Sequence, residues 1–282
     1  MPELPEVEIV SRLIGSAIAG AGVESTLAPG VNALKTFDPP LHALDGSRLT
    51  GVSRRGKHLL VANDAGLVLL VHLMSAGRLQ LFDRRAGLRD RTSRVLLRLD
   101  DGRELRLREF GTKQAAWAKL LRAGEVSRDE ALATLGPEAW PDPPPFGPLL
   151  GGQARPLHTL LRDQRVLAGI GRSWVDEILW EARLSPFKRG SDVSAEEADA
   201  LRDATVARLG EAVALYAETL SLPLPDRLPL PLKVHRHEGE PCPRCGTTLA
   251  AVHFEDYVIA YCPACQTEGR VLKDRRLSRL LK

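Results

Sequence analysis

The first eight residues, Met-Pro-Glu-Leu-Pro-Glu-Val-Glu, hold the groups in this chain that could do covalent chemistry. If Met1 is removed, Pro2 begins the chain with a secondary amine, whose ordinary pKa of roughly 8 leaves a reactive fraction unprotonated at neutral pH. Such an amine attacks a carbonyl-like carbon and forms a Schiff base, and Glu3 beside it could transfer protons. The alternative is structural, because prolines restrain an arm and glutamates suit the first turn of a helix.

All four cysteines of the chain lie near its C-terminal end, in two closely spaced pairs. Cys242 and Cys245 form the first pair, and Cys262 and Cys265 form the second after sixteen intervening residues. Four thiolates at this spacing are typical of a tetrahedral zinc site on two knuckles of a β-hairpin. The sequence therefore predicts one structural Zn²⁺, which folds a ribbon and takes no part in chemistry.

Length and composition limit the class of protein. The chain has 282 residues, is 44% hydrophobic and carries a formal charge of +3, which favours two domains plus a small appendage. The excess of Lys and Arg lies in residues 233–282, which hints at a polyanionic partner for that end. The longest apolar stretch, residues 66–74, is too short to span a bilayer, and we find no signal-peptide pattern. A soluble protein of the cytoplasm is expected.

The first part of the chain predicts an antiparallel β-sandwich flanked by helices, which we place at residues 1–125. An apolar stripe indicates an amphipathic helix over residues 5–18. Short β-rich segments follow, and Asn63-Asp64-Ala65-Gly66 and Asp100-Asp101-Gly102 are typical hairpin turns between them. The predicted strands are residues 58–62, 67–72, 78–82, 94–99 and 104–108.

The rest of the chain is predicted to be helical up to the cysteines. After a linker at 126–155 we expect a domain at 156–232 and a zinc finger at 233–282. Two helices, 156–163 and 172–183, flank a glycine turn whose backbone N–H groups could bind a phosphate, although glycines also serve tight turns for steric reasons. A longer helix should begin at Ser194, which can form a capping box with Glu197.

Five motifs follow one another in a fixed order along nearly the whole chain. They are the N-terminal octapeptide, Arg54-Arg55-Gly56-Lys57, Leu135-Gly136-Pro137-Glu138, Ala168-Gly169-Ile170-Gly171 with Asp176-Glu177, and Gly239-x-Pro241-Cys242. In this combination the chain resembles the formamidopyrimidine-DNA glycosylase and endonuclease VIII family of base-excision repair enzymes. The resemblance implies an α+β multidomain fold: an N-terminal antiparallel β-sandwich, a helix-two-turn-helix domain and a C-terminal zinc-finger β-hairpin, with DNA in the cleft between them.

The resemblance also implies an activity, that of a bifunctional DNA glycosylase and abasic-site lyase acting on oxidised bases. Pro2 would attack C1′ of a flipped-out nucleotide, and β elimination, with δ elimination expected to follow, would cut the strand. Glu3 would be the general acid that opens the sugar ring, and Glu6 would hold the nucleotide or a water. Lys57 and His72 would bind the lesion phosphates, unless they are an exposed strand lysine and a structural histidine.

Further residues would contact DNA if the resemblance holds. Arg108 and Phe110 occupy the arginine and phenylalanine positions that fill the gap left by a flipped base; a buried strand phenylalanine is the alternative for Phe110. Gly171 and Arg172 would bind a phosphate at the glycine turn, and Tyr257 would contact DNA from the zinc finger. The implied partner is duplex DNA with damaged bases or abasic sites, bound by a monomer associated with the nucleoid.

Four positions depart from the family pattern. Met74 is displaced by one residue from the expected wedge methionine, and in a strand this shift turns a side chain to the opposite face. Arg172 replaces an asparagine, and Tyr257 replaces an arginine, so these two changes could compensate. Residues 221–233 are shorter and richer in proline than the family's loop over 8-oxopurines. The lesion that is preferred, the base opposite it and the balance of elimination steps therefore stay open.

Two other classes of function remain in view. A non-catalytic protein that binds damaged DNA would keep the fold and lose excision, which the altered phosphate contacts favour and Pro2, Glu3 and Lys57 oppose. A zinc-ribbon module of a protein complex would explain only the last fifty residues. Salt-sensitive binding to duplex DNA would exclude this module, because phosphate contacts release counterions.

Overall fold

The computed structural model describes residues 2–87, 90–255 and 257–272. The chain forms two compact units, one made of residues up to 134 with 213–229, the other of 135–212 with the residues from 230 onward. None of the helices in these described ranges is both long and apolar enough to cross a membrane.

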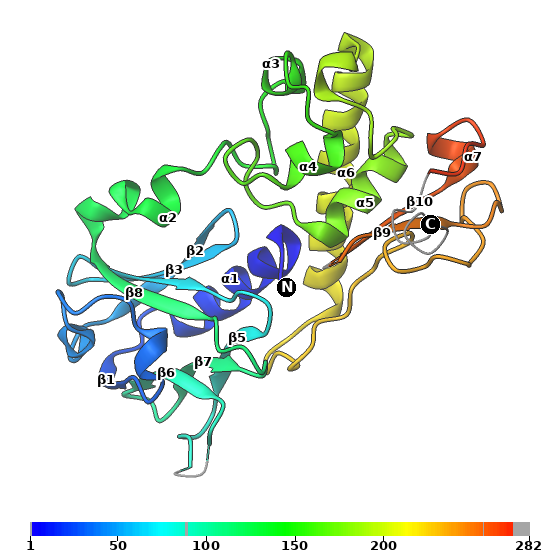
Figure 1. The fold of residues 1–282 in the computed structure, drawn as a ribbon. Helices are drawn as coiled ribbons and strands as arrows, with labels where there is room; N and C mark the ends of the chain where they lie inside the picture. The colour runs from blue at the N-terminus through cyan, green and yellow to red at the C-terminus, as the bar shows by residue number, and fades with distance from the viewer. Residues whose placement is uncertain (1, 88–89, 256, 273–282) are drawn as a thin grey trace. The chain divides into compact units, whose positions relative to one another are not determined.

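The first unit is a sandwich of two four-stranded antiparallel sheets, with strand orders β1-β6-β7-β5 and β2-β3-β4-β8 (Figure 1). The predicted antiparallel sandwich is confirmed. The strands are β1 (Val23–Leu27), β2 (Leu49–Arg55), β3 (His58–Asn63), β4 (Leu67–His72), β5 (Gly77–Phe82), β6 (Ser93–Leu99), β7 (Glu104–Glu109) and β8 (Trp117–Arg122).

Five of these strands coincide with the predicted segments, and both predicted turns join neighbours, β3 to β4 and β6 to β7. Strands β1, β2 and β8 were not predicted, and each lies at the edge of its sheet. An edge strand pairs on one side only and carries more polar side chains. Apolar and polar residues therefore alternate less clearly along an edge strand. In β2, for example, exposed and half-buried positions follow the first residue.

Helix α1 (Leu4–Ile18) closes the core of the sandwich, as its apolar stripe predicted. Val7, Ile14 and Ile18 are buried against side chains of both sheets. Gly15 lets the helix approach β2, because a Cβ atom there would lie 2.9 Å from the backbone nitrogen of Val52. This packing fixes the start of α1, and with it the position of Glu3 and Glu6.

The proline-rich connector of residues 220–229 also belongs to the first unit. The side-chain amide of Gln80 donates to the carbonyl of Leu224 at 2.9 Å, and Nε of Arg78 donates to the carbonyl of Asp226 at 2.6 Å. The division therefore differs from the sequence-based boundary, which grouped 156–232 in one domain. Hydrogen bonds to β5 hold the connector on the sandwich, and its sequence alone does not predict this pairing.

The second unit holds the predicted helix-two-turn-helix. Its helices are α3 (Phe146–Leu150), α4 (Leu157–Arg162), α5 (Arg172–Glu181) and the first part of α6 (Ala195–Thr219), while the short α2 (Glu130–Ala133) belongs to the first unit. Ser194 caps α6 as predicted, since its Oγ accepts from the N–H of Glu197 and the Glu197 carboxylate accepts from the N–H of Ser194.

The glycine turn between α4 and α5 is held from inside the unit. Gly169 has a φ of +110°, which only glycine adopts without strain, and its N–H donates to Oε1 of Gln164 at 3.0 Å. The N–H of Ala168 donates to the carbonyl of Pro137. Gly136 permits this contact, because a Cβ atom there would lie 2.5 Å from the carbonyl oxygen of Arg165. Part of the turn is thus built for steric reasons.

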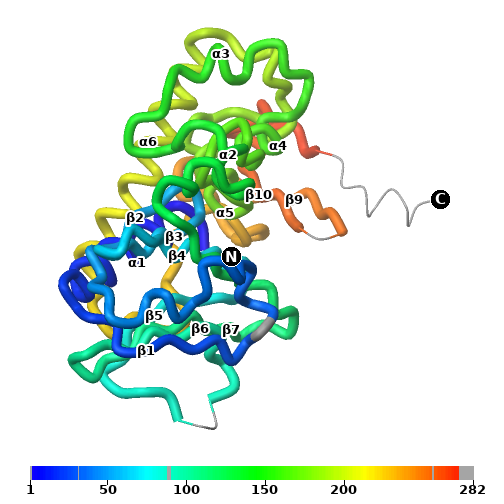
Figure 2. The backbone as a smooth tube through the Cα atoms, turned by 90° about the vertical axis from the view of Figure 1, so that its left-hand side faces the viewer, coloured from blue at the N-terminus to red at the C-terminus, as the bar shows by residue number. Residues whose placement is uncertain are grey.

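The last described part of the second unit contains the predicted β-hairpin. Strands β9 (Ala250–His253) and β10 (Val258–Tyr261) are antiparallel neighbours (Figure 2), and a short helix α7 (Pro263–Gln266) follows them. Buried Val252, Ala260 and Tyr261 give the hairpin a small apolar face.

Candidate active site

The carboxylates that follow Pro2 are buried at the start of α1. Glu3 and Glu6 each expose only 2% of their surface. The N–H of Glu3 donates to Oε2 of Glu6 at 2.7 Å, which is one half of a capping box. Burial of two carboxylates beside one another is costly unless their environment supplies partners. Such an arrangement is typical of a site with acid and base roles.

Tyr216, near the end of α6, completes this cluster from far along the chain. Its hydroxyl oxygen lies 2.9 Å from Oε1 of Glu6 and 2.7 Å from the carbonyl oxygen of Pro229. Burial, followed by the charge of Glu6, raises the pKa of Tyr216 far above its ordinary value, so the hydroxyl keeps the proton that it donates. The sequence does not predict this contact, because Tyr216 fits the apolar stripe of the helix that begins at Ser194; a hydroxyl on that stripe was the available signal.

Lys57 lies in the tight turn between β2 and β3, beside Gly56, whose φ is +56°. It is 7% exposed. The alternative of an exposed strand lysine is therefore wrong, because the side chain is buried and its residue belongs to a turn. Lysine side chains are rarely buried, so the burial of Lys57 sets it apart from the ordinary surface lysines that keep a protein in solution.

His72 ends strand β4, and its ring stacks on Trp117 with centroids 5.6 Å apart. Burial, with nearby His58 and the charge of Lys57, lowers the pKa of His72 to about 3. Its Nδ1 accepts a hydrogen bond from the N–H of Met74 at 3.0 Å, so the ring proton is on Nε2. At neutral pH the imidazole of His72 is thus uncharged, and its Nε2–H is a hydrogen-bond donor.

Met74 does not lie in a strand. It follows the end of β4 in a turn and has a φ of +49°, which a non-glycine residue rarely adopts. The argument from alternating strand faces was therefore wrong, because the turn and not the pleat sets the direction of this side chain.

Phe110 lies one residue beyond the end of β7 and is 43% exposed. The alternative of a buried strand phenylalanine is wrong, since the chain leaves the sheet before this residue. The guanidinium of Arg108 lies 4.6 Å from the centre of the Phe110 ring. The two residues thus form a cation–π pair at the end of the strand.

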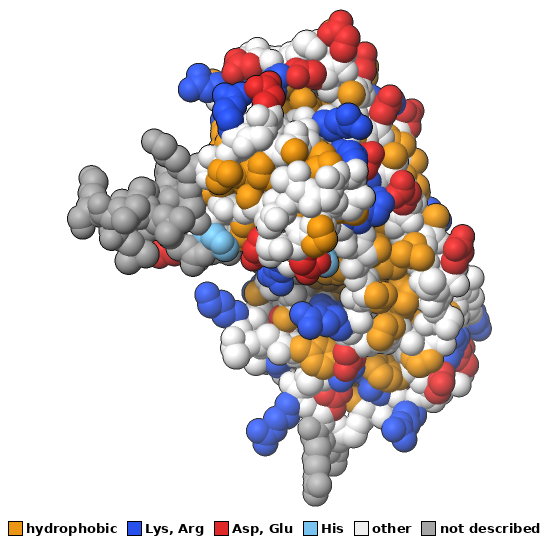
Figure 3. Space-filling view, turned by 90° about the vertical axis from the view of Figure 1, so that its right-hand side faces the viewer, with side chains coloured by type: hydrophobic (Ala, Val, Ile, Leu, Met, Phe, Trp, Pro, Cys, Tyr) orange, Lys and Arg blue, Asp and Glu red, His pale blue; other side chains and the backbone are white. Residues whose placement is uncertain are grey.

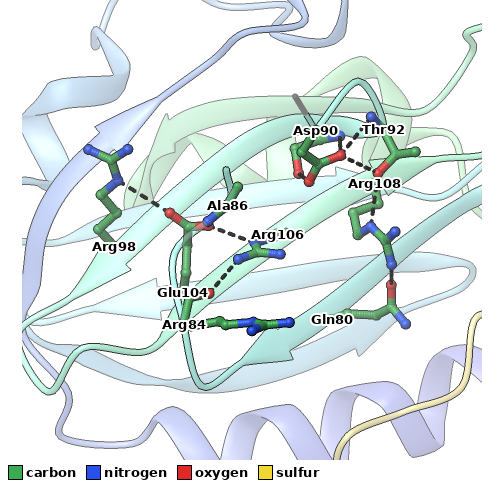
Figure 4. Close-up of polar contacts among 10 residues, drawn as sticks. Gln80, Arg84, Ala86, Asp90, Thr92, Arg98, Glu104, Arg106 and Arg108 are labelled. Carbon is green, nitrogen blue, oxygen red and sulfur yellow. Dashed lines mark hydrogen bonds and ion pairs between the residues drawn. The ribbon is translucent and has the colours of Figure 1, made fainter. Parts of the chain in front are cut away.

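Hydrogen bonds surround the guanidinium of Arg108. Its Nε donates to Oγ1 of Thr92 at 3.0 Å and its Nη1 donates to Oε1 of Gln80 at 2.9 Å (Figure 4). Thr92 in turn donates to Asp90 at 2.7 Å. The same Nη1 forms an ion pair with Oδ1 of Asp226 at 2.9 Å. The sequence singles out Arg108 but does not predict any of its three partners, Thr92, Gln80 and Asp226.

In the second unit, the two residues that depart from the family pattern lie against each other. The guanidinium of Arg172, the first residue of α5, is 5.0 Å from the centre of the Tyr257 ring. Arg162 lies 4.6 Å from the same ring, and Phe254 stacks on it with centroids 4.6 Å apart. Gly171 is the N-cap of α5 in extended conformation, with a φ of −129°.

The four cysteines form a metal site with the geometry of zinc. Their sulfurs lie within 4.8 Å of one another. Individual sulfur–sulfur distances are 3.5 Å (Cys245 to Cys262), 3.5 Å (Cys245 to Cys265) and 4.0 Å (Cys242 to Cys265). Bonds of about 2.3 Å to a tetrahedral zinc place sulfurs about 3.8 Å apart. The cluster therefore holds one structural Zn²⁺, as predicted.

Two buried carboxylates of α5 fasten this ribbon to the helix. Glu177 accepts hydrogen bonds from three consecutive backbone N–H groups, those of residues 233–235, at 2.8 to 3.0 Å. Asp176 accepts from the N–H of Ala260 at 3.0 Å and lies 2.7 Å from Nδ1 of His235. The Asp-Glu motif thus has a structural role that its sequence did not reveal.

Charge on one face of the molecule is mixed rather than concentrated (Figure 3). On the face drawn in Figure 3, Lys and Arg side chains alternate with Asp and Glu. This fits a formal charge of only +3.

The sandwich with its buried N-terminal carboxylates and the helix-two-turn-helix with its zinc ribbon together define a class of DNA glycosylase. Family models match in the same order: the formamidopyrimidine-DNA glycosylase N-terminal domain at residues 1–112, the H2TH domain of the same enzyme at 145–223, and the zinc finger found in FPG and IleRS at 239–267.

Comparisons with individual proteins point to the same family as the family models. The formamidopyrimidine-DNA glycosylase of Roseiflexus is 34% identical, and the match covers 94% of this chain and 100% of that protein. A point mutant of the Lactococcus lactis FPG in complex with Fapy-dG DNA is 26% identical with a TM-score of 0.84, over 94% of this chain and 100% of that chain. The L. lactis Fpg complex with abasic-site DNA is 25% identical, also with a TM-score of 0.84, over 94% and 99%. The chain belongs to the formamidopyrimidine-DNA glycosylase family and is a DNA glycosylase.

Proposed function

We propose that this protein excises oxidised bases from duplex DNA and then cuts the strand at the abasic site, through a Schiff base on Pro2. One observation carries the proposal: the residue after Pro2 is a buried carboxylic residue, Glu3, whose backbone and neighbour Glu6 are fixed by α1 and Tyr216. A reactive amine needs this kind of fixed acid and base next to it.

The chemistry runs in two stages. The nitrogen of Pro2 attacks C1′, the bond from C1′ to the damaged base breaks, and the base leaves with a proton. Glu3 then protonates the sugar ring oxygen as its bond to C1′ breaks, which leaves a cationic Schiff base. This cation acidifies C2′, so removal of a C2′ proton expels the 3′ phosphate; a second elimination expels the 5′ phosphate.

Phosphate binding is assigned to residues of both units. Lys57 supplies charge and His72 an Nε2–H donor near the lesion. Gly171 and Arg172 at the start of α5 bind a backbone phosphate, and Tyr257 supports the Arg172 guanidinium through its ring. Arginine binds phosphate through two donors and reaches further than asparagine. Arg172 could therefore do the work of both family residues, the asparagine at its own position and the arginine that Tyr257 replaces.

The preferred substrates follow from chemistry and from the relatives. The L. lactis structures hold a ring-opened guanine and an abasic site in DNA, and we expect this chain to act on both. Its connector is short and hydrogen-bonded to β5, which does not favour a mobile loop that closes over 8-oxoguanine. We expect a monomer that acts on the nucleoid.

A labelled duplex tests the proposal. Incubation of the protein with a 5′-labelled strand that carries one ring-opened guanine should give base release followed by a shortened strand ending in a 3′ phosphate. The control is a protein with an N-terminal extension before Pro2, which converts the amine into an amide. Salt-sensitive binding without cleavage by the unextended protein would instead favour a non-catalytic protein that recognises damaged DNA.

A further inference from the structure

We infer that Asp226 of the connector is a specificity-determining residue, which weakens discrimination of the base opposite the lesion by occupying Arg108. The inference rests on the proposed function, because it takes Arg108 to contact the base left without a partner. It concerns the residues of the first unit only, all of them described, and it identifies a role for the short proline-rich connector.

Most of the hydrogen-bond donors of Arg108 are already engaged. A guanidinium has five N–H groups: one on Nε and two on each terminal nitrogen. Thr92 accepts from Nε at 3.0 Å. Gln80 and Asp226 each accept from Nη1, both at 2.9 Å. Among the described residues, these contacts account for three donors and leave the two on Nη2.

The remaining donors of Arg108 are poorly arranged for reading a base. A guanidinium reads two neighbouring acceptors with parallel N–H groups on two different nitrogens. The two N–H groups of one nitrogen diverge by about 120°, as in any planar NH₂ group. With Nε and Nη1 both occupied, Arg108 can offer one well-directed hydrogen bond instead of a pair.

Asp226 is held in place mainly through its backbone. Its carboxylate is 59% exposed, and an ion pair that exposed is weak alone. Its backbone, however, is fixed by Arg78, whose Nε donates to the Asp226 carbonyl at 2.6 Å. Gln80 adds two bonds, to the Leu224 carbonyl at 2.9 Å and to the Asp226 carboxylate at 3.1 Å. The backbone of the connector thus positions the Asp226 carboxylate beside Nη1 of Arg108.

Gln80 alone cannot occupy both donors of Arg108 Nη1. It occupies only one N–H of Nη1, so removal of Asp226 would return the other N–H, adjacent to Nη2. Phe110 and Phe82 keep the guanidinium plane in position, at 4.6 Å and 5.3 Å from their ring centres. A fork formed by Nη1 and Nη2 would then be available for two adjacent acceptors.

Of the four bases, only cytosine presents two adjacent acceptors, N3 and O2, on the edge that faced its former partner. A second hydrogen bond in a bidentate pair changes discrimination between bases by roughly tenfold or more. We therefore expect the natural protein to accept the four opposite bases within a narrow range, and Asp226→Ala to gain roughly tenfold preference for cytosine.

The experiment uses the full-length protein and four duplexes that differ only in the base opposite one abasic site. The dissociation constant and the single-turnover cleavage rate are measured for the natural protein, Asp226→Ala, Asp226→Asn and Arg108→Ala. Asp226→Asn keeps an acceptor oxygen for Nη1, so its ratios between bases should match the natural protein. Cleavage of the preferred duplex by Asp226→Ala shows that the variant is folded.

Two results would overturn the inference, and they are distinguishable. If Arg108→Ala alters the ratios between bases and Asp226→Ala does not, Arg108 reads the base without restraint from the connector. If neither variant alters the ratios, Arg108 does not face the opposite base, and that part of the proposed function fails as well. A gain of cytosine preference by Asp226→Ala, absent from Asp226→Asn, supports the inference.

Discussion

The hydroxyl oxygen of Tyr216 lies 2.9 Å from Oε1 of Glu6, although 210 residues separate them in sequence. The same hydroxyl lies 2.7 Å from the carbonyl oxygen of Pro229. One buried side chain therefore connects the connector to the carboxylate that accepts from the N–H of Glu3. We regard Tyr216 as a positioning residue for the groups next to Pro2.

Removal of this hydroxyl should slow the chemistry and leave DNA binding intact. Tyr216→Phe keeps the ring in the core but removes the hydroxyl that donates to Oε1 of Glu6, and the loss of a hydrogen bond to a buried charged group costs about 1 to 3 kcal/mol. We expect the single-turnover rate on abasic-site DNA to fall roughly tenfold, since about 1.4 kcal/mol on the barrier is a factor of ten, with an unchanged dissociation constant.

Tyr261→Phe is the matched control. Tyr261 is also fully buried, and its hydroxyl oxygen accepts from the N–H of Leu272 in the second unit. The Tyr261→Phe protein should have a lower free energy of unfolding and an unchanged single-turnover rate. An unaltered rate for Tyr216→Phe would mean that Glu6 does not depend on this contact.

The pair of Arg172 and Tyr257 predicts a compensated exchange. Arg172→Ala should weaken binding of duplex DNA at all sequences and lower the salt dependence by about one phosphate contact. The double exchange Arg172→Asn with Tyr257→Arg should restore affinity, because it returns the charge to the finger. Titrations at several salt concentrations measure both effects; loss of binding by the double variant would contradict compensation.

Zinc removal should unfold the ribbon and weaken DNA binding. The described apolar residues of this ribbon form only a small cluster with Trp180, so metal binding supplies much of its folding free energy. A chelator, or Cys245→Ser, should remove amide exchange protection from β9 and β10 and lower the affinity for DNA. Protection retained after proven loss of zinc would show that the hairpin folds without the metal.

Acid should destabilise the first unit through its buried histidines. In the folded protein burial lowers the pKa of His58 to about 4 and that of His72 to about 3, whereas the unfolded chain titrates near a pKa of about 6.5. Between these values the unfolded state binds more protons, so stability falls as pH falls from about 6.5 towards 4. At pH 4 the loss is at most about 3 kcal/mol for each histidine.

Urea unfolding at about pH 7.5 and about pH 4.5, on either side of the ordinary histidine pKa, measures this loss. His72→Phe keeps a ring to stack on Trp117 and has no proton to bind, so its stability should depend less on pH than that of the natural protein. His42→Phe is a control, because His42 lies at the exposed surface. Equal pH dependence in all three proteins would show that His72 does not resist protonation.

Local sequence signals predicted most of the regular structure. The apolar stripe predicted α1, alternation predicted the five strands that it matched, and Ser194 with Glu197 predicted the start of α6. Each of these signals lies within a few residues of the element that it predicts. The edge strands β1, β2 and β8 were missed because one-sided pairing tolerates polar residues.

Contacts between distant residues could not be predicted in the same way. Tyr216 looked like one more apolar residue of a helix, and Asp226 like a charge in a proline-rich linker. Their partners, Glu6 and Arg108, lie far away in sequence. The resemblance identified the residues proposed for chemistry, while the packing of this chain determines what surrounds them.

The central claim is that the Pro2 amine forms a Schiff base with DNA. Borohydride reduction of the Met1-free protein on a duplex with one abasic site should trap a covalent adduct, and peptide mass spectrometry should place it on Pro2. The protein extended before Pro2 should bind the duplex and give no adduct. An adduct on a lysine, or none from a protein that holds zinc and binds DNA, would contradict the account.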